Sequence, residues 1–139
     1  MAELNQFKLE VISPERVFYE GDVEMVELTT TEGDIGILAG HIPLTTIVAP
    51  GVLTISEPGD QTKEAAVLEG FMEITGDKVT ILAQSCEWPD EIDVDRAREA
   101  RDRAERRLKS SDSNVNMARA ELALRKSLVR LELADGDKR

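Results

Sequence analysis

EWPDEIDV, residues 87–94, is the stretch that decides the fold. Pro89 cannot donate a hydrogen bond to a sheet, so it ends the last expected strand. Asp93 is a typical helix N-cap, and Ile92 before it and Ala97 one turn later are placed to form a hydrophobic staple across the helix start. The stretch therefore marks a boundary between strands and helices.

Charge and composition change at this boundary. Residues 1–90 carry four basic and seventeen acidic side chains, a formal charge of −13, whereas residues 91–139 carry thirteen basic and eleven acidic ones, a charge of +2. Every aromatic residue and every proline lies in the first part. We therefore expect an acidic, turn-rich domain over residues 1–88 and an arginine-rich helical domain over residues 89–139.

The net charge of −11 argues against nucleic acid or an anionic membrane as the main partner, because both bind basic surfaces. No apolar run approaches the ~20 residues that cross a membrane, and the start, MAELNQFKLE, lacks the pattern of a signal peptide. The single cysteine, Cys86, rules out an internal disulfide and fits a reducing cytosol. Any membrane association is therefore expected to come through a protein partner.

The first domain contains many short runs rich in Val, Ile, Leu and Thr, separated by Gly, Pro and Asp turn signals at a spacing of ~8–12 residues. Gly76-Asp77, between two such runs, predicts a two-residue hairpin turn. No helix-length periodic segment interrupts the strands, which disfavours a fold of alternating strands and helices. The pattern predicts a β-sandwich or barrel.

The second domain predicts two helices, over residues 94–109 and 115–133, with a polar break at 110–114 and an end near Gly136. Two such helices form an antiparallel hairpin. The first helix offers mostly alanine, which buries little at ~0.8 kcal/mol per CH₂ group, so the hairpin would open easily. A permanently docked hairpin that covers the sandwich is the alternative. The expected faces are Ala97, Ala100, Ala104 and Leu108 on the first helix, Val115, Ala118, Leu122 and Val129 on one stripe of the second, and Leu124, Leu128 and Leu131 on another.

The residue inventory offers no evident catalytic or metal site. His41 is the single histidine and lies beside glycine and near proline, which is typical of a turn or an interface. Cys86 has no histidine or second thiol nearby and is expected to be a small buried hydrophobe. The usual zinc, phosphate-loop and dinucleotide motifs are absent from the sequence. We therefore expect no catalytic residue, no metal ligand and no required cofactor.

Basic residues recur on single faces of the expected helices. Arg96 and Arg103 are seven residues apart, and Arg119, Lys126 and Arg130 share a stripe. Folding the hairpin near residue 112 predicts that Arg96, Lys126 and Arg130 converge near residues 87–93. Such clusters bind phosphate or an acidic protein surface. The alternative is a solvated helix with i,i+4 ion pairs.

EGDIGILAGHIPL at residues 32–44, followed by PGVL at 50–53, resembles the signature of the epsilon subunit of bacterial F-type ATP synthase. The resemblance continues through GFMEI (70–74), VTILA (79–83), AERRL (104–108) and RAELAL (119–124), and it covers essentially the whole chain. It implies an N-terminal β-sandwich of about ten strands followed by a C-terminal antiparallel two-helix hairpin. This agrees with the expectation from the residues.

The resemblance also implies a place and partners. The chain would be a non-catalytic rotor subunit of a proton-translocating ATP synthase, peripheral at the cytoplasmic face of the cell membrane as part of F1. Its partners would be the gamma subunit, the c-ring and the alpha3beta3 hexamer, with no nucleic acid and no direct membrane insertion. Glu32 and Asp34 would meet the c-ring, and His41 would lie in an interface turn with gamma and the c-ring.

In this family the C-terminal helices can leave the sandwich, extend along gamma and block rotation in the direction of ATP hydrolysis. Basic residues of the second helix then meet an acidic segment of the beta subunit. Arg119, Lys126 and Arg130 stand at the matching positions. The resemblance therefore implies an inhibitory role for these three residues.

Some bacterial members bind ATP in the folded hairpin through an I/L-D-x-x-R-A motif, which IDVDRA at residues 92–97 matches. ATP is therefore an expected regulatory ligand. Residue 126 is lysine here but looks to be arginine in ATP-binding members, and a lysine cannot bind phosphate through two parallel hydrogen bonds as an arginine does. The implied ATP-binding residues are Glu87, Ile92, Asp93, Arg96, Ala97, Arg103, Lys126 and Arg130. A free-standing nucleotide sensor of the same architecture is the alternative, which co-purification with gamma distinguishes.

Overall fold

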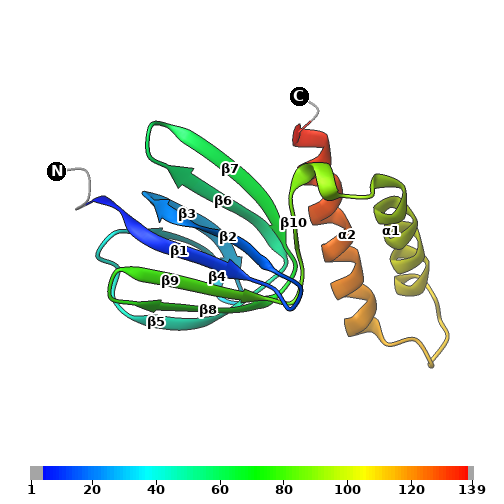
Figure 1. Ribbon diagram of the computed structural model, residues 1–139. Coiled ribbons are helices and arrows are strands. Elements are labelled where there is room, and N and C mark those ends of the chain that lie inside the picture. The colour runs from blue at the N-terminus through cyan, green and yellow to red at the C-terminus, as the bar shows by residue number, and fades with distance from the viewer. Residues whose placement is uncertain (1–4, 138–139) are drawn as a thin grey trace.

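The computed structural model describes residues 5–137, which form a ten-stranded β-sandwich followed by a helical hairpin (Figure 1). This confirms the predicted fold class. The strands are β1 (Phe7–Ile12), β2 (Val17–Val23), β3 (Met25–Thr30), β4 (Gly33–Leu38), β5 (Leu44–Val48), β6 (Gly51–Glu57), β7 (Gln61–Val67), β8 (Gly70–Thr75), β9 (Lys78–Ala83) and β10 (Cys86–Glu87). A short 3-10 helix, η2 (Pro89–Glu91), leads to the helices α1 (Val94–Leu108) and α2 (Met117–Asp137).

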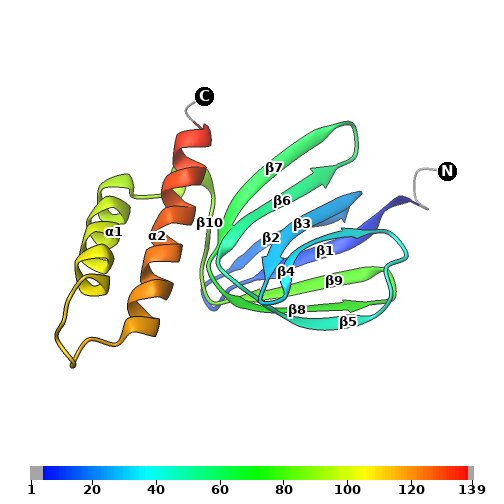
Figure 2. The same ribbon diagram turned by 180° about the vertical axis from the view of Figure 1, so that it is seen from behind.

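The strands follow the order β10-β7-β6-β3-β5-β8-β9-β1-β2, with β4 paired to β3 (Figure 2). All neighbours are antiparallel except β1 and β9. The predicted turn at Gly76-Asp77 joins β8 to β9, where Thr75 pairs with Lys78. Alternate residues of the strands face one apolar core, as expected for half-buried strands. Its fully buried members include Leu9, Val26, Ile37, Leu53, Ile55, Met72 and Ile81.

Trp88 connects the two ends of this sheet path. It follows β10, the strand at one end, and stacks on Phe18 of β2, the strand at the other end, with ring centroids 4.2 Å apart. Glu91 of η2 accepts hydrogen bonds from Arg16 Nη2 at 2.7 Å and from the Trp88 backbone N–H at 2.9 Å. The hydrogen bond from Arg16 lowers the pKa of Glu91. The boundary segment is thus fixed to the sandwich.

Both helices begin at a side-chain cap. The Asp93 carboxylate accepts a hydrogen bond from the Arg96 N–H at 3.1 Å, which confirms the predicted N-cap of α1. In α2 the cap is Asn116, whose side chain accepts from the Arg119 N–H at 3.1 Å. The predicted start of this helix at Val115 was therefore two residues early. The predicted end near Gly136 agrees with the structure, in which α2 continues to Asp137.

The helix seam is made of small side chains, as the sequence predicted for α1. Ala97 and Ala104 are the buried residues of α1, and the main packing partner of this helix is α2. On α2, however, Ala118 and Leu128 of the predicted stripes are exposed. Of the residues predicted on α2, Leu131 is buried, and the other buried residues of this helix are Ala120, Ser127, Leu133 and Ala134. The predicted stripes were therefore only partly correct, because α2 packs against two surfaces at once, α1 and the sandwich.

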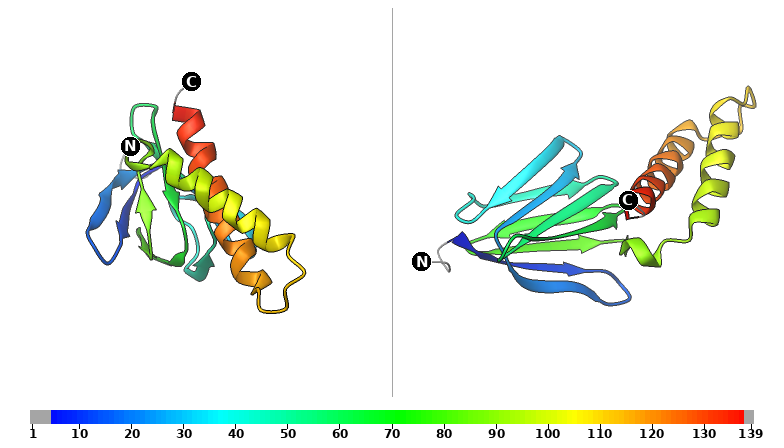
Figure 3. Two further views of the ribbon diagram at one scale, coloured as in Figure 1. Left: turned by 90° about the vertical axis from the view of Figure 1, so that its right-hand side faces the viewer. Right: turned by 90° about the horizontal axis from the view of Figure 1, so that it is seen from above.

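The sandwich side of α2 lies against β6, β7 and η2, with α1 on the outside (Figure 3). A second, small apolar cluster forms this contact and is separate from the sandwich core. Its buried members are Ala66, Leu68, Ile92, Leu133 and Ala134. Within residues 5–137, no helix is long and apolar enough to cross a membrane.

Gly70→Ala tests the closest backbone approach in the sandwich. A Cβ atom at Gly70 would lie 2.1 Å from the Leu82 carbonyl oxygen of the paired strand, so β8 and β9 would have to separate. We expect a loss of about 2–3 kcal/mol in the free energy of unfolding, measured by urea denaturation. In the control Gly36→Ala, the nearest atom is the flexible end of Met25, and the loss should be clearly smaller. Equal losses would contradict the proposed clash.

Cys86 gives a pH-dependent test of burial. The thiol is buried, and this burial raises its pKa to about 11, so the folded protein holds little thiolate at pH 8.5. An unfolded chain, with a cysteine pKa of about 8.5, is half ionised at this pH. We expect a thiol reagent to react at least about 100-fold more slowly with the folded protein than with the urea-unfolded chain. Similar rates would show that Cys86 is open to solvent.

Candidate functional site

A cavity of about 180 Å³ lies where α1, α2 and β10 meet. Asp93 and Arg96 stand at the start of α1, and Arg103 projects from the middle of the same helix. Arg130 reaches the cavity from α2, and Glu87 reaches it from the last strand. The lining residues are Glu87, Asp93, Arg96, Ala97, Ala100, Arg103 and Arg130.

Six of the eight residues expected for ATP line this cavity. Ile92 does not, because it is buried in the apolar cluster beneath α2. Ala100 lines the cavity but was not among the expected site residues. It is three residues after Ala97, and two small side chains at this spacing leave room on one face of a helix. That spacing was the available signal in the sequence.

The cavity has a mixed but net basic lining. Arg130 Nε donates to Glu87 Oε1 at 2.7 Å, and both side chains are about three-quarters buried. The Asp93 carboxylate caps α1 by accepting a hydrogen bond from the Arg96 N–H. The side chains of Arg96 and Arg103 are exposed. Three cations against two carboxylates leave a formal charge of +1. The N-terminus of α1 adds a partial positive charge.

Lys126 does not join this cavity, so the predicted convergence of three cations is only partly correct. Arg96 and Arg130 meet there, but Lys126 Nζ donates to Glu69 Oε1 at 2.8 Å. Glu69 lies between β7 and β8, 57 residues earlier in the chain. Spacing along α2 alone cannot reveal this competing acid. Arg119, about two turns before Lys126 on α2, is exposed.

The three residues expected at the interface with gamma and the c-ring do not form one cluster. Glu32 lies in the turn between β3 and β4, and Asp34 follows in β4, where it accepts a hydrogen bond from Thr29 Oγ1 at 2.9 Å. His41 comes after the other end of β4, with its Nδ1 2.7 Å from the Ile42 carbonyl oxygen. Both acidic side chains are exposed. The two groups therefore lie at opposite ends of the same strand.

Other titratable groups are engaged in structural contacts. The Tyr19 hydroxyl donates to Glu57 at 2.5 Å, and burial together with this hydrogen bond raises its pKa. Cys86 is buried and largely protonated at neutral pH. Across residues 5–137, no group of three or more His, Cys, Asp or Glu side chains is arranged to hold a metal ion.

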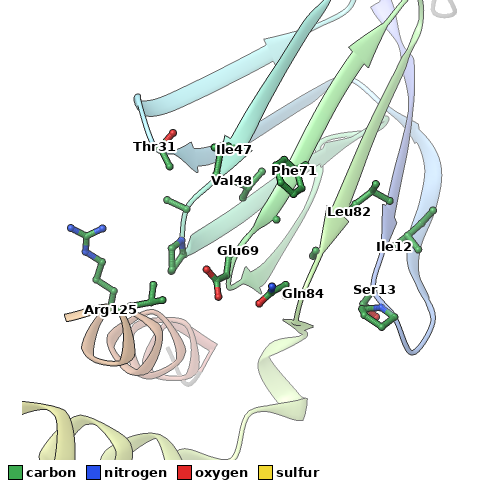
Figure 4. A pocket seen from close by; sticks show the side chains of 16 residues that line it. Ile12, Ser13, Thr31, Ile47, Val48, Glu69, Phe71, Leu82, Gln84 and Arg125 are labelled. Carbon is green, nitrogen blue, oxygen red and sulfur yellow. The ribbon is translucent and has the colours of Figure 1, made fainter. Parts of the chain in front are cut away.

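A larger cavity of about 580 Å³ opens between one end of the sandwich and α2 (Figure 4). It is bordered by an apolar row that crosses neighbouring strands in register. Ile47 of β5 pairs with Phe71 of β8, which pairs with Leu82 of β9. These side chains are 51%, 59% and 52% exposed, which is unusual for large apolar residues on a monomer.

The row continues onto the next two strands. Leu82 pairs with Ile12 of β1, and Ile12 pairs with Val17 of β2, which is 57% exposed. Sequence reasoning missed this surface. The available signal was an apolar residue at a solvent-facing position in each strand, but the strand order is needed to place these residues side by side.

Comparison with protein families gives two matches that together span most of the chain. Residues 6–89 match the β-sandwich domain of the ATP synthase delta/epsilon chain. Residues 90–135 match its long α-helix domain.

Several bacterial proteins are similar over nearly their whole length. The ATP synthase epsilon chain of Caldanaerobacter subterraneus subsp. tengcongensis is 52% identical over 129 residues, covering 92% of this chain and 93% of that one. The epsilon chain of Halalkalibacterium halodurans is 45% identical over 125 residues, with 89% and 93% covered. That of Caldicellulosiruptor bescii is 43% identical over 133 residues, with 96% of each chain covered.

Solved structures show the same fold. A chain of the Euglena gracilis mitochondrial ATP synthase, in a structure of OSCP, F1 and the c-ring, superposes with a TM-score of 0.80 at 23% identity, covering 97% of this chain and 82% of that one. A chain of the Tetrahymena thermophila enzyme, from its central stalk and c-ring, gives 0.55 at 13% identity, with 95% and 96% covered. With both domain matches and the identities of 43–52%, the chain belongs to the family of ATP synthase epsilon chains, which are non-catalytic subunits of the central stalk.

Proposed function

We propose that this chain couples F1 to the c-ring of a proton-translocating ATP synthase and restrains ATP hydrolysis through its helical hairpin, with bound ATP holding the hairpin compact. The supporting observation is the cavity that joins α1, α2 and β10. Its walls come from three elements, and they separate if the helices leave the sandwich. A ligand in this cavity therefore favours the compact form.

The cavity chemistry fits an anionic nucleotide. Arg96, Arg103 and Arg130 provide guanidinium groups, which bind phosphate oxygens with paired hydrogen bonds. Ala97 and Ala100 leave a small apolar wall. At about 180 Å³ the cavity is smaller than the ~300 Å³ typical of small-molecule sites, so part of the nucleotide would extend into solvent. The exposed side chains of Arg96 and Arg103 are free to follow it.

The energetic scale also fits regulation by a ligand. α2 is held on the sandwich by a small apolar cluster and by two ion pairs, so its docking depends on few contacts. A ligand at ten times its Kd stabilises the form that binds it by ~1.4 kcal/mol, provided the other form does not bind. Such a shift is comparable to the free energy of weak docking.

The released helices would carry the inhibitory contacts. In the compact form Lys126 and Arg130 are paired with Glu69 and Glu87 of the sandwich. Opening would free these two cations, together with Arg119, for the acidic segment of the beta subunit. Lys126 and Arg130 would thus bind the sandwich in the compact form and the beta subunit in the inhibitory form, so the two forms could not exist at the same time.

The apolar row on β5, β8, β9, β1 and β2 is the proposed contact with gamma. Apolar patches of this kind mark protein interfaces, and the row borders the cavity beside α2. Glu32 and Asp34 form an exposed acidic turn that suits the c-ring, and His41 would belong to a separate contact at the other end of β4. Through these partners the chain would be peripheral at the cytoplasmic face of the cell membrane.

ATP binding is tested by calorimetry on the whole chain with Mg-free ATP. We expect saturable one-to-one binding, weakened about tenfold or more by Arg96→Ala or Arg103→Ala, since each removes a charge-assisted contact to phosphate. Arg98→Ala is the matched control, because Arg98 lies on the same helix, pairs with Asp95 and does not line the cavity. A folded parent chain that does not bind ATP would refute the proposal that ATP holds the hairpin compact.

The gamma contact is tested by Phe71→Glu, which places a charge within the apolar row. We expect this variant to lose co-purification with gamma while its melting temperature stays near that of the parent, because Phe71 is more than half exposed. Thr62→Glu on β7, also exposed but away from the row, is the control and should co-purify normally. Retention of gamma by Phe71→Glu would exclude this face, and failure of the parent to bind gamma would favour a free-standing sensor.

A further inference from the structure

Lys126 and Arg130 leave the same side of α2, one helical turn apart, and each ends on a carboxylate of the sandwich. Arg130 pairs with Glu87 and lines the cavity, whereas Lys126 pairs with Glu69 and does not. Lys126 Nζ lies 2.8 Å from Glu69 Oε1, and the two side chains are 28% and 31% exposed. The pair is therefore accessible enough to exchange partners.

The cavity is short of positive charge for a triphosphate. Its three arginines are offset by Glu87 and Asp93, which leaves a formal +1. Lys126 is the residue one turn before Arg130 on α2, and its flexible four-carbon stem can be redirected without moving the helix. It is thus an available further cation, and Glu69 is the group that holds it.

We propose that Glu69 sets the affinity of the cavity for ATP by holding Lys126 away from it. This inference rests on the proposed ATP site. Glu69 and a phosphate oxygen compete for the same ammonium group, so binding ATP with full contacts requires the Lys126–Glu69 pair to break. Glu69 is accordingly a positioning residue, which acts on the ligand only through Lys126.

The alternative is that the pair only braces α2 against the sandwich. A brace makes the opposite prediction, because loss of either partner would loosen the docked helix and weaken ATP binding equally. The Lys126–Glu69 contact is itself a charge-assisted hydrogen bond of 2.8 Å, but it brings one negative charge to the ammonium group, whereas a triphosphate brings several. The balance therefore favours a gain in affinity when Glu69 is neutralised.

The experiment compares Glu69→Gln, Lys126→Gln and the double variant with the parent, as whole chains, by calorimetry with Mg-free ATP. We expect Glu69→Gln to bind about three- to tenfold more tightly than the parent, and the double variant to show no gain. Glu73→Gln is the control, since it removes an exposed carboxylate of nearby β8 and should leave the affinity within about twofold of the parent. Melting temperatures without nucleotide show whether docking itself has changed.

The outcomes separate the two ideas. Weaker binding by both Glu69→Gln and Lys126→Gln, with lower melting temperatures, would establish a brace and overturn the proposal. An equal gain in Glu73→Gln or in the double variant would also overturn it, because the effect would then be one of net charge. If the parent binds but Glu69→Gln is no tighter, this inference fails and the ATP site stands. If the parent and all variants fail to bind, the ATP site fails and this inference with it.

Discussion

The stacking of Trp88 on Phe18 is the contact on which the rest of the structure depends. It joins the two end strands of the sheet path and is reinforced by the ion pair between Arg16 and Glu91. Because Glu91 lies two residues before the cap at Asp93, this contact also fixes where α1 begins. The closure of the sandwich therefore sets where the helices begin, and with them the position of the candidate cavity.

Local chemistry made most of the fold predictable from the sequence. Alternating strands, the Gly76-Asp77 turn and the Asp93 cap each depend on a few adjacent residues, and each was found where it was expected. The stripe that α2 buries was not predictable in this way. It depends on Ala66 and Leu68 of the sandwich, which are far away in the sequence, and on α1 at the same time.

The same distinction applies to the functional surfaces. Six expected residues reach the cavity. Spacing along the helices and the fold of the hairpin indicated Arg96 and Arg130, whereas Glu87, Asp93 and Ala97 were implied by the family resemblance. Lys126 does not line the cavity because it pairs with Glu69, and the spacing of residues along α2 cannot reveal this distant acid. The apolar row needs the register of five strands, so no single run of sequence contains it.

Ser127 is fully buried in α2, yet its hydroxyl donates to the Leu124 carbonyl oxygen of its own helix at 2.8 Å. No hydrogen bond from this side chain crosses to α1 or to the sandwich in the part of the chain that the structure describes. If α2 leaves the sandwich as proposed, its one buried hydroxyl keeps its own partner, and only the Lys126–Glu69 and Arg130–Glu87 pairs have to be replaced by water. Separation and return would then exchange apolar surface and two ion pairs with water, and no hydrogen bond within the helix would have to be rebuilt.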